Sequence, residues 1–247
     1  MISVLFVTLS LFFSFFAYAG DKELIACIDD HPPYQYLGPE PYGSHITALK
    51  KLSKVLDRNL TYIQAPNFAR CVALLESGHV DVIAGLNITE ERKEFAFYAP
   101  FKLADKLTII TKKDIAINTY EDFKGKIIGV PRGSTYFFKF DNDDSLNKVS
   151  IQNERVGLSL LVKERIDLMM TNPMMLDLHL SEIQRRALRV SPMSLDNERS
   201  KETYFGFSKK HNIGLEEEQI KLLISDAFKQ GVFLPEPQKA QKLAPHY

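Results

Sequence analysis

Short apolar runs alternate with amphipathic segments through the first half of the chain. Residues 24–29, 60–64 and 80–84 form brief apolar runs of the kind found in buried strands. Between them, residues 46–56 and 68–76 carry apolar positions at helical spacing. This alternation predicts an α/β unit in which helices join the strands.

A second α/β unit is predicted to be inserted into the first. Its elements are a strand at 106–111, a capped turn at 118–125, a strand at 127–130, a helix at 153–163 and a strand at 166–170. A strand at 203–207 then returns to the first unit, followed by a helix at 215–229. The chain would cross between the units twice, which makes a hinge. We expect residues 20–109 with 203–247 to form lobe 1 and residues 110–202 to form lobe 2.

Residues 1–19 form the most apolar segment and end in Ala17-Tyr18-Ala19 before Gly20. This small-x-small ending predicts a cleavable signal peptide and a periplasmic protein. The segment contains no Lys or Arg, so an uncleaved anchor is the alternative. No cysteine follows the apolar run, which argues against a lipid-anchored form.

The composition excludes several classes of function. With 31 basic and 31 acidic residues the formal net charge is zero, which makes nucleic acid an unsuitable partner. The sequence has no Cys-x-x-Cys pair, no His cluster and no phosphate-loop motif. We therefore predict neither a metal site nor a cofactor.

The segment 78–101 combines a buried strand, a polar turn and an arginine. Gly85 and Asn87 interrupt the apolar run, and Thr89 is placed to cap a short helix that contains Arg92. The free amides of a helix start favour negative charge, and a guanidinium forms a planar fork suited to a carboxylate. We predict an anion clamp; the alternative is a surface salt bridge from Arg92 to Glu90 or Glu94.

This segment closely resembles the amino-acid-binding branch of the periplasmic solute-binding proteins. The family pattern runs G-x-x-D, then T-x-x-R, then an aromatic-rich segment that ends in Pro and an aromatic. The residues in register are Gly78, Asp81, Thr89, Arg92, Phe95, Phe97, Pro100 and Phe101. The resemblance implies a monomer with the two-lobed type 2 periplasmic-binding-protein fold, two hinge crossings and a ligand cleft between the lobes. It also implies that the C-terminal segment packs back on lobe 1.

Cys27 and Cys71 are the only cysteines. Export would bring them into an oxidising compartment. In the resembled fold the first strand and the second helix are neighbours in one lobe, which implies a disulfide between these two residues. A pair of buried thiols is the alternative.

The resemblance places several ligand contacts in lobe 1. Tyr34, in the family's Pro-aromatic pair, and Phe68 would stack on the ligand, while Gly85, Asn87 and Arg92 would contact it with polar groups. His31 stands where the family commonly has a stacking aromatic. Phe68 has an alternative role as a core residue, and Arg70 either forms a salt bridge at the helix start or points into the cleft.

Lobe 2 is expected to contribute Ser134, Thr135 and Asn172. Ser134 and Thr135 follow a strand, where exposed amides suit an anion, and the resemblance implies that these residues both contact the ligand and cap the next helix; capping alone is the alternative. At Asn172 the family usually has an acid that binds the α-ammonium of the ligand. An amide has no net charge, so we predict weak binding of ordinary α-amino acids. The alternative is that Asn172 only turns the chain before Pro173.

These features predict a binding protein that delivers a small carboxylate-bearing solute to a membrane ABC-type transporter. A soluble sensor for a membrane receptor would use the same pocket. An enzyme resembling the cyclohexadienyl dehydratases is a further alternative, with Asp29, Asp30 and His31 as acid and base. Successive side chains of a strand point in opposite directions, which argues against that enzyme.

Overall fold

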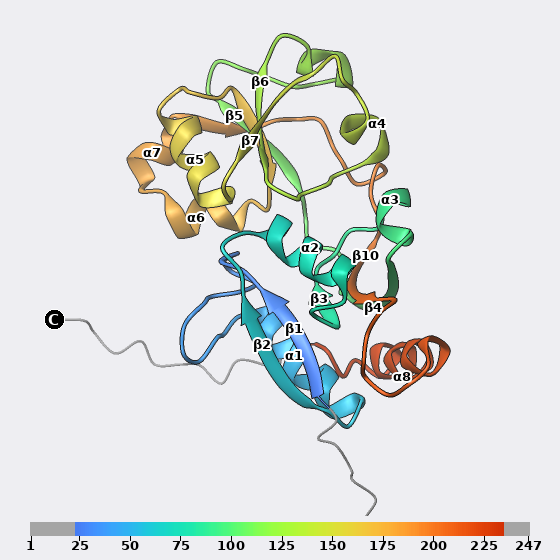
Figure 1. Cartoon of the computed structure of the whole chain (residues 1–247). Coiled ribbons are helices and arrows are strands. Elements are labelled where there is room, and N and C mark those ends of the chain that lie inside the picture. Colours follow the sequence, from blue (N-terminus) through green and yellow to red (C-terminus); the bar gives the residue numbers. More distant parts are fainter. Residues whose placement is uncertain (1–22, 235–247) are drawn as a thin grey trace, which may run out of the picture.

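The computed structural model describes residues 23–234. The predicted signal peptide, at residues 1–19, and the tail from Pro235 onwards lie outside this range. Within it, no helix combines the length and the apolar character needed to cross a membrane. The described chain forms two lobes, each built on its own β-sheet (Figure 1).

The sheet of the first lobe has the strand order β2-β1-β3-β10-β4. Its strands are β1 (Glu23–Ile28), β2 (Asn59–Gln64), β3 (Val82–Ala84), β4 (Ala96–Leu103) and β10 (Glu202–Ser208). β1 is parallel to β2 and β3, whereas β10 is antiparallel to β3 and β4. The returning strand β10 therefore lies between β3 and β4 in the sheet, although it comes about one hundred residues later in the sequence.

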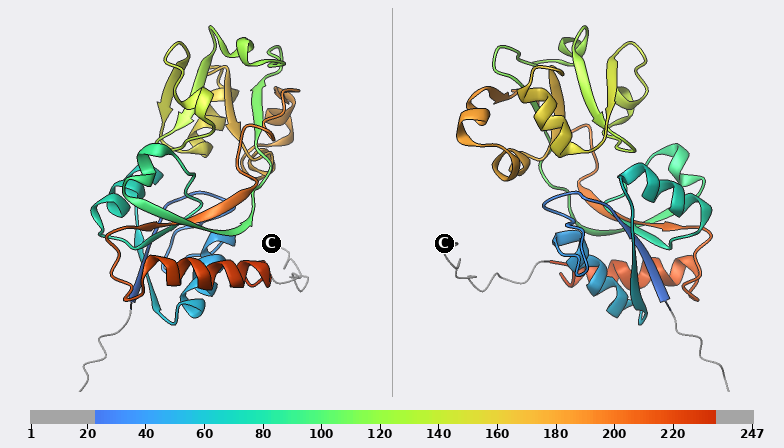
Figure 2. Two further views of the ribbon diagram at one scale, coloured as in Figure 1. Left: turned by 90° about the vertical axis from the view of Figure 1, so that its right-hand side faces the viewer. Right: turned by 60° about the vertical axis from the view of Figure 1, so that its left-hand side comes forward.

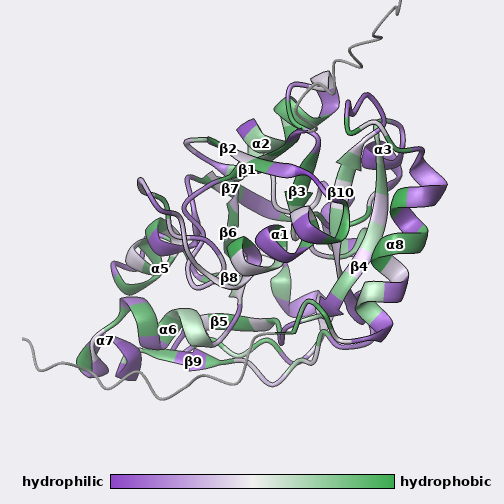
Figure 3. Cartoon of the chain, turned by 90° about the horizontal axis from the view of Figure 1, so that it is seen from below, coloured by the Kyte–Doolittle hydropathy of each residue, from purple (hydrophilic) through white to green (hydrophobic). Residues whose placement is uncertain are grey.

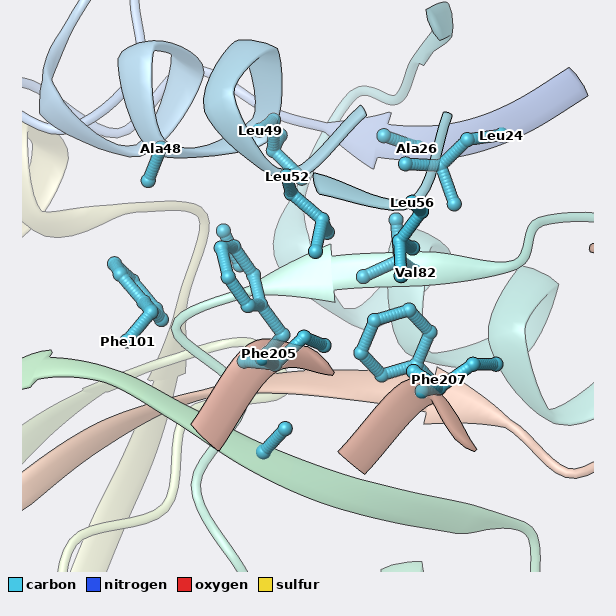
Figure 4. Close-up of a cluster of buried hydrophobic side chains, with 14 of the residues drawn as sticks. Leu24, Ala26, Ala48, Leu49, Leu52, Leu56, Val82, Phe101, Phe205 and Phe207 are labelled. Atoms are coloured by element: carbon cyan, nitrogen blue, oxygen red, sulfur yellow. The ribbon is translucent and has the colours of Figure 1, made fainter. Parts of the chain in front are cut away.

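Helices cover both faces of this sheet. Alternation along β1 sends Leu24, Ala26 and Ile28 into the core shared with α1 (Ser44–Val55) and α8 (Glu217–Lys229) (Figure 4). Cys27 faces the other side, where α2 packs. α2 spans Phe68–Ser77, and the short α3 spans Glu90–Lys93. Figure 2 shows α8 running along the base of the first lobe beside α1.

Helix α8 shows why the end of the chain returns to lobe 1. Ile220, Ile224 and Ala227 are buried at spacings of three and four residues, and the exposed surface of the helix carries mostly polar residues together with Leu222 and Leu223 (Figure 3). Its buried stripe joins the core below β4 and β10. The described part of the C-terminal segment thus packs on the first lobe.

The sheet of the second lobe has the order β7-β6-β8-β5-β9. Its strands are β5 (Thr108–Lys112), β6 (Ile127–Pro131), β7 (Asn147–Ile151), β8 (Leu168–Thr171) and β9 (Leu188–Val190). Its helical elements are η1 (Tyr120–Phe123), α4 (Phe138–Asp141), α5 (Glu154–Val162), α6 (Met174–His179) and α7 (Glu182–Arg186). Ile109 and Ile110 point to opposite faces, one core lying under η1 and α4 and the other under α5 and α6.

Two segments connect the lobes, one between β4 and β5 and one between β9 and β10. They lie side by side: the Arg199 guanidinium of the second segment donates a hydrogen bond to the Asp105 carbonyl of the first at 3.4 Å. This arrangement, with two sheets and two crossings, is the predicted type 2 fold.

The predicted disulfide between Cys27 and Cys71 is confirmed, with the two Cα atoms 5.4 Å apart. Both cysteines are buried in the core between β1 and α2. The disulfide closes a sequence separation of 44 residues inside the first lobe.

The sequence predicts an aromatic-rich segment where the structure has strand β4, Ala-Phe-Tyr-Ala-Pro-Phe-Lys-Leu. Pro100 lacks a backbone N–H and is therefore tolerated in a strand only at an edge or an irregularity. β4 is the outermost strand of its sheet, and its pairing with β10 shifts register between Thr203 and Tyr204, next to Pro100.

Candidate functional site

A cleft of about 1030 Å³, including the space open to solvent at its mouth, lies between the lobes. Every residue predicted to contact a ligand lines it. They are His31, Tyr34, Phe68, Gly85, Asn87 and Arg92 from the first lobe and Ser134, Thr135 and Asn172 from the second. Their roles as ligand contacts remain predictions, but the fold brings all of them together.

Most of these residues follow the carboxyl end of a strand, where ligands bind in open α/β sheets. β1 ends at Ile28 and leads to His31, while β3 ends at Ala84 and leads to Asn87. In the second lobe β6 leads to Thr135 and β8 leads to Asn172. The parallel strands of each sheet thus present their ends toward the cleft.

Arg92 is buried, with 5% of its surface exposed, and its guanidinium connects the two lobes. Nη1 donates to the Asn87 carbonyl at 3.1 Å and to the Thr135 hydroxyl at 3.3 Å. Nη2 donates to the Gly133 carbonyl at 2.5 Å. The Thr89 side chain accepts from the Arg92 amide at 3.1 Å, as expected for a helix cap.

The surface salt bridge considered for Arg92 is absent from residues 23–234, where Glu90 pairs with Lys93 instead. Burial lowers the pKa of Arg92. A guanidinium remains charged in proteins, so it stays a desolvated cation without a carboxylate partner in this range. It has five N–H donors, and the contacts to protein groups leave some of them for a ligand.

Two hydrogen bonds donated by asparagine side chains also cross the cleft. Asn87 Nδ2 donates to the Thr135 carbonyl at 2.6 Å, and Asn172 Nδ2 donates to the Tyr34 hydroxyl at 2.7 Å. Asn172 Oδ1 also accepts from the Met174 amide at 2.9 Å, so it stabilises the turn after β8 as well. The turn and the cleft contact are therefore compatible roles for one amide.

Neither Ser134 nor Thr135 caps the next helix, so the expected capping role is wrong, both beside a ligand contact and as the sole role. Helix α4 begins at Phe138 with Phe137 as its N-cap residue, and no side chain caps it. The loop is too long for either hydroxyl to be the cap, because three residues separate Ser134 from Phe138.

Acidic groups and a histidine gather at another part of the cleft. His31 Nε2 lies 3.3 Å from Glu154 Oε2 across the lobes, and Asp30 pairs with Arg155 at 3.2 Å. Asp29 is 5% exposed, and its Oδ1 has no hydrogen-bond partner within residues 23–234. Among these residues no group of His, Cys, Asp or Glu has an arrangement that would hold a metal ion.

The environment shifts the pKa values of this group. Burial, opposed by His31, raises the pKa of Asp29 to about 6. Burial alone would lower the pKa of His31, but the charge and hydrogen bond of Glu154 outweigh it and raise the value. The expectation that successive side chains would diverge here is wrong, because β1 ends at Ile28 and Asp29, Asp30 and His31 all line the cleft.

A stack of aromatic rings forms the floor on the first-lobe side. The rings of Tyr34 and His45 are stacked with centroids 4.7 Å apart. His45 is buried, and desolvation holds its pKa well below the usual range, so the ring is neutral. Gly85 has φ +87°, and a Cβ there would lie 2.6 Å from His45 Cε1. Phe68 contributes its face below Arg92, with the guanidinium carbon 5.9 Å from the ring centroid.

Several cleft residues were missed by sequence reasoning. They include His45, Asp105, Lys106, Arg132, Tyr136, Glu154 and Arg199. Glu154 follows Asn153, the N-cap residue of α5. An Asn at this position is a local signal that the helix begins at Glu154. Arg199 lies in the second connecting segment, for which the sequence has no motif.

Arg70 has neither of the roles considered for it. It is exposed in the first turn of α2, it is not among the cleft-lining residues, and it forms no salt bridge within residues 23–234. The cap of α2 comes from Asn67, whose side chain accepts from the Arg70 amide at 3.0 Å.

Known proteins resemble this chain in sequence. The arginine-binding extracellular protein ArtP of Bacillus subtilis is 31% identical over 119 residues, 47% of this chain and 46% of ArtP. The ABC transporter arginine-binding protein 1 of Escherichia coli is 31% identical over 127 residues, 50% of this chain and 51% of that protein. The chain thus spans about half the length of these curated relatives.

Solved structures share the fold at low sequence identity. Holo ArgBP from T. maritima matches with a TM-score of 0.65 and 21% identity, covering 84% of this chain and 89% of that one. An ancestral arginine-binding protein bound to arginine matches with a TM-score of 0.67 and 22% identity, covering 86% and 95%. The model of the bacterial extracellular solute-binding proteins, family 3, matches residues 24–213. This chain belongs to that family.

Proposed function

We propose that this protein is a periplasmic receptor that encloses a small carboxylate-bearing solute between its lobes and delivers it to a membrane ABC-type transporter. The observation that carries the proposal is the buried Arg92 fork, which has no carboxylate partner among residues 23–234 and lines a cleft between two lobes. A ligand carboxylate would supply the missing negative charge. The match of ArtP and the other arginine-binding relatives supports a transport role.

Groups from both lobes would hold the solute at once. Thr135 and Ser134 lie on the second lobe beside Arg92, and Tyr34 and Phe68 present aromatic faces from the first. Contacts made only when the lobes meet favour the closed state by their differential affinity. We propose that residues 20–109 with 203–247 and residues 110–202 move as lobes of a monomer about the two connecting segments.

The solute is proposed to lack an ordinary α-amine or to carry its amine elsewhere. Asn172 supplies a neutral amide where the resembled family usually has an acid, and its Nδ2 is directed to Tyr34. An amine placed away from that position would find Asp29, whose Oδ1 has no partner in the part of the chain that the structure describes.

A thermal-shift panel of amino acids, dicarboxylates and short peptides tests the proposal. We expect at least one carboxylate to raise the melting temperature of wild type but not of Arg92→Ala. Exposed Arg165→Ala is the matched control, and it should respond like wild type. The absence of any stabilising solute across the panel would count against a solute receptor. A soluble sensor would bind the same solute, and transport measured with the receptor gene deleted separates the two roles.

An enzyme is the second candidate, and the pKa of Asp29 is the observation that favours it. A carboxyl with a pKa of about 6 beside His31 suits acid–base catalysis near neutral pH. Turnover of prephenate or arogenate that disappears in His31→Ala would support an enzyme. Absence of turnover in wild type would exclude this dehydratase activity.

A further inference from the structure

The charged groups of the cleft are not paired evenly. Its lining includes the acids Asp29, Asp30, Asp105 and Glu154 and the bases Arg92, Lys106, Arg132 and Arg199. Asp30 pairs with Arg155, Glu154 pairs with His31, and Asp105 pairs with Lys102. Within residues 23–234 none of the four bases is in a salt bridge. The acids are thus mostly neutralised by the protein, and the bases are not.

This pairing leaves the cations of the cleft lining available to an anion. Glu91 and Asp141 bring negative charge near Arg92, and Asp196 brings it near Arg199, without forming a salt bridge with either arginine. Arg155 and Lys102, which are not among the lining residues, each bring a positive charge to an acid of the lining. His31 adds another when it is protonated. Walls of low dielectric strengthen the interaction of these cations with an anionic group of a solute.

Arg199 is the base whose position is hardest to explain without a ligand. It is half-buried in the second connecting segment, next to the first. Its one hydrogen bond within the described chain is a 3.4 Å contact from Nη1 to the Asp105 carbonyl. The acid of that same residue is already held by Lys102. Most of the five guanidinium donors therefore have no protein acceptor in this range.

The surroundings of Arg199 connect it to the site of Arg92. Tyr34 and Tyr136 are its electrostatic neighbours, together with Asp105 and Asp196. Tyr34 bonds Asn172 across the cleft, and Tyr136 directly follows Thr135, which contacts Arg92. The Tyr136 hydroxyl is committed to the Met170 carbonyl at 3.1 Å. Both phenols are neutral at physiological pH because burial raises the pKa of each, so neither balances the charge of Arg199.

We propose that Arg199 binds a second anionic group of the solute, so that the ligand is a dianion held by Arg92 at one end and Arg199 at the other. This inference rests on the proposed function. A partly desolvated guanidinium whose neighbouring acids form no salt bridge with it is costly, and a ligand carboxylate would offset that cost by charge-assisted hydrogen bonds. The competing role for Arg199 is purely structural, to hold the two connecting segments together. A single long hydrogen bond to a carbonyl stabilises that arrangement little.

Calorimetry with wild type, Arg199→Gln and the control Arg189→Gln tests the inference. Arg189 is exposed in β9, so Arg189→Gln removes one positive charge at a position away from the cleft. The probes are the dicarboxylates succinate, glutarate and adipate, the monocarboxylates butyrate and valerate, and L-arginine. We expect a dicarboxylate to bind best. Arg199→Gln should weaken it by about tenfold or more, whereas Arg189→Gln should change it less than about twofold.

Three results have distinct meanings. Loss of dicarboxylate affinity in Arg199→Gln, with the melting temperature of the ligand-free protein unchanged, supports a ligand contact. Tightest binding of L-arginine or a monocarboxylate, unaffected by Arg199→Gln, overturns the second anion site and leaves the solute receptor standing. No binding of any probe, together with no response in the wider thermal-shift panel, overturns the proposed function and this inference with it.

Discussion

Gly133 of the second lobe lies directly against Ala69 in the first turn of α2. A Cβ built on Gly133 would lie 2.8 Å from the Ala69 Cα and 2.8 Å from its amide nitrogen. These are backbone atoms of the opposite lobe, so neither can move aside locally. The close approach therefore exists only while the lobes are together.

Gly133→Ala should weaken ligand binding by about tenfold or more, because the methyl group keeps the lobes apart and closure supplies the affinity. Gly125→Ala is a matched control. Gly125 has φ +72° and Gly133 φ +80°, but nothing lies within 4 Å of a Cβ at Gly125. Both variants should lose about 1 kcal/mol of stability from backbone strain, and only Gly133→Ala should lose affinity. Equal affinity of the two variants in calorimetry would show that closure does not need this contact.

Arg92→Ala should abolish carboxylate binding, with a loss of about 2–5 kcal/mol. Arg92 is buried, so the substitution affects the fold as well as the ligand site. Its removal leaves the Asn87 and Gly133 carbonyls without their donor, so the melting temperature should fall as well. Arg92→Lys keeps the charge but not the fork, and calorimetry should show intermediate affinity. If Arg92→Ala bound carboxylates with wild-type affinity, Arg92 would not be the anion-binding residue.

The sequence predicted the alternation of elements in the first lobe and the strand-end residues, because both leave local patterns, but it did not predict β4, β7 or β9 or the helices α6 and α7. Gly78 and Asp81 belong to the family motif for structural reasons. Gly78 ends α2 in a left-handed conformation, and the Asp81 carboxylate accepts from the Ile25 and Asn212 amides. Glu154 and Arg199 could not be predicted as cleft residues, since their positions depend on how the two lobes meet. That relationship has no short-range signal in the sequence.

Asn172→Asp should increase affinity for ordinary α-amino acids and leave their deaminated analogues unchanged or weaker. A carboxylate at this position would supply the charge that offsets desolvation of an ammonium group. The fold should tolerate it, because the Tyr34 hydroxyl can donate to the new oxygen and the Met174 amide keeps its acceptor. Calorimetry with an amino acid and its deaminated analogue checks this. Tight wild-type binding of the amino acid, with no gain in the variant, would assign the ammonium to another acid such as Asp29.

Asp29 and His31 should each contribute less stability as pH rises from about 4 to 8, against the opposite contributions of His45 and His179, whose lowered pKa values make stability rise toward pH 6.5. The pKa of Asp29 is raised from 3.8 to about 6, so its contribution is present below pH 3.8 and is lost as pH rises toward 6. The pKa of His31 is raised above 6.5, so its pair with Glu154 contributes fully below pH 6.5 and is lost as pH rises beyond that value. Asp29→Asn should remove on the order of 2 kcal/mol from the fall in unfolding free energy between pH 4 and 6. His31→Gln should remove the fall that occurs above pH 6.5.

Urea unfolding at intervals of pH measures both changes. Asp144→Asn is the control for Asp29→Asn, because it removes one negative charge at an exposed position. A profile for Asp29→Asn that follows wild type between pH 4 and 6 would contradict the buried carboxylate as the cause.

Replacing Cys27 and Cys71 by serine should lower the free energy of unfolding by about 4 kcal/mol on the chain-entropy model. The loop of 44 residues lies within the first lobe, so the loss should appear in that lobe first. Hydrogen exchange of the double variant should show faster exchange in β1 and α2 than in β6 and β8. Uniform acceleration across both lobes would mean that the lobes unfold as one unit.

The disulfide also has a consequence for recognition. It joins the end of β1 to the first turn of α2, two residues from Asp29 on one side and three from Phe68 on the other. These flanking residues are parts of the cleft wall, so the crosslink fixes their backbone before a solute arrives. A wall that is already ordered loses less conformational freedom on binding, and this preorganisation adds affinity without any new contact. Reduction of the disulfide should therefore shorten the residence time of the solute even under conditions where the protein stays folded.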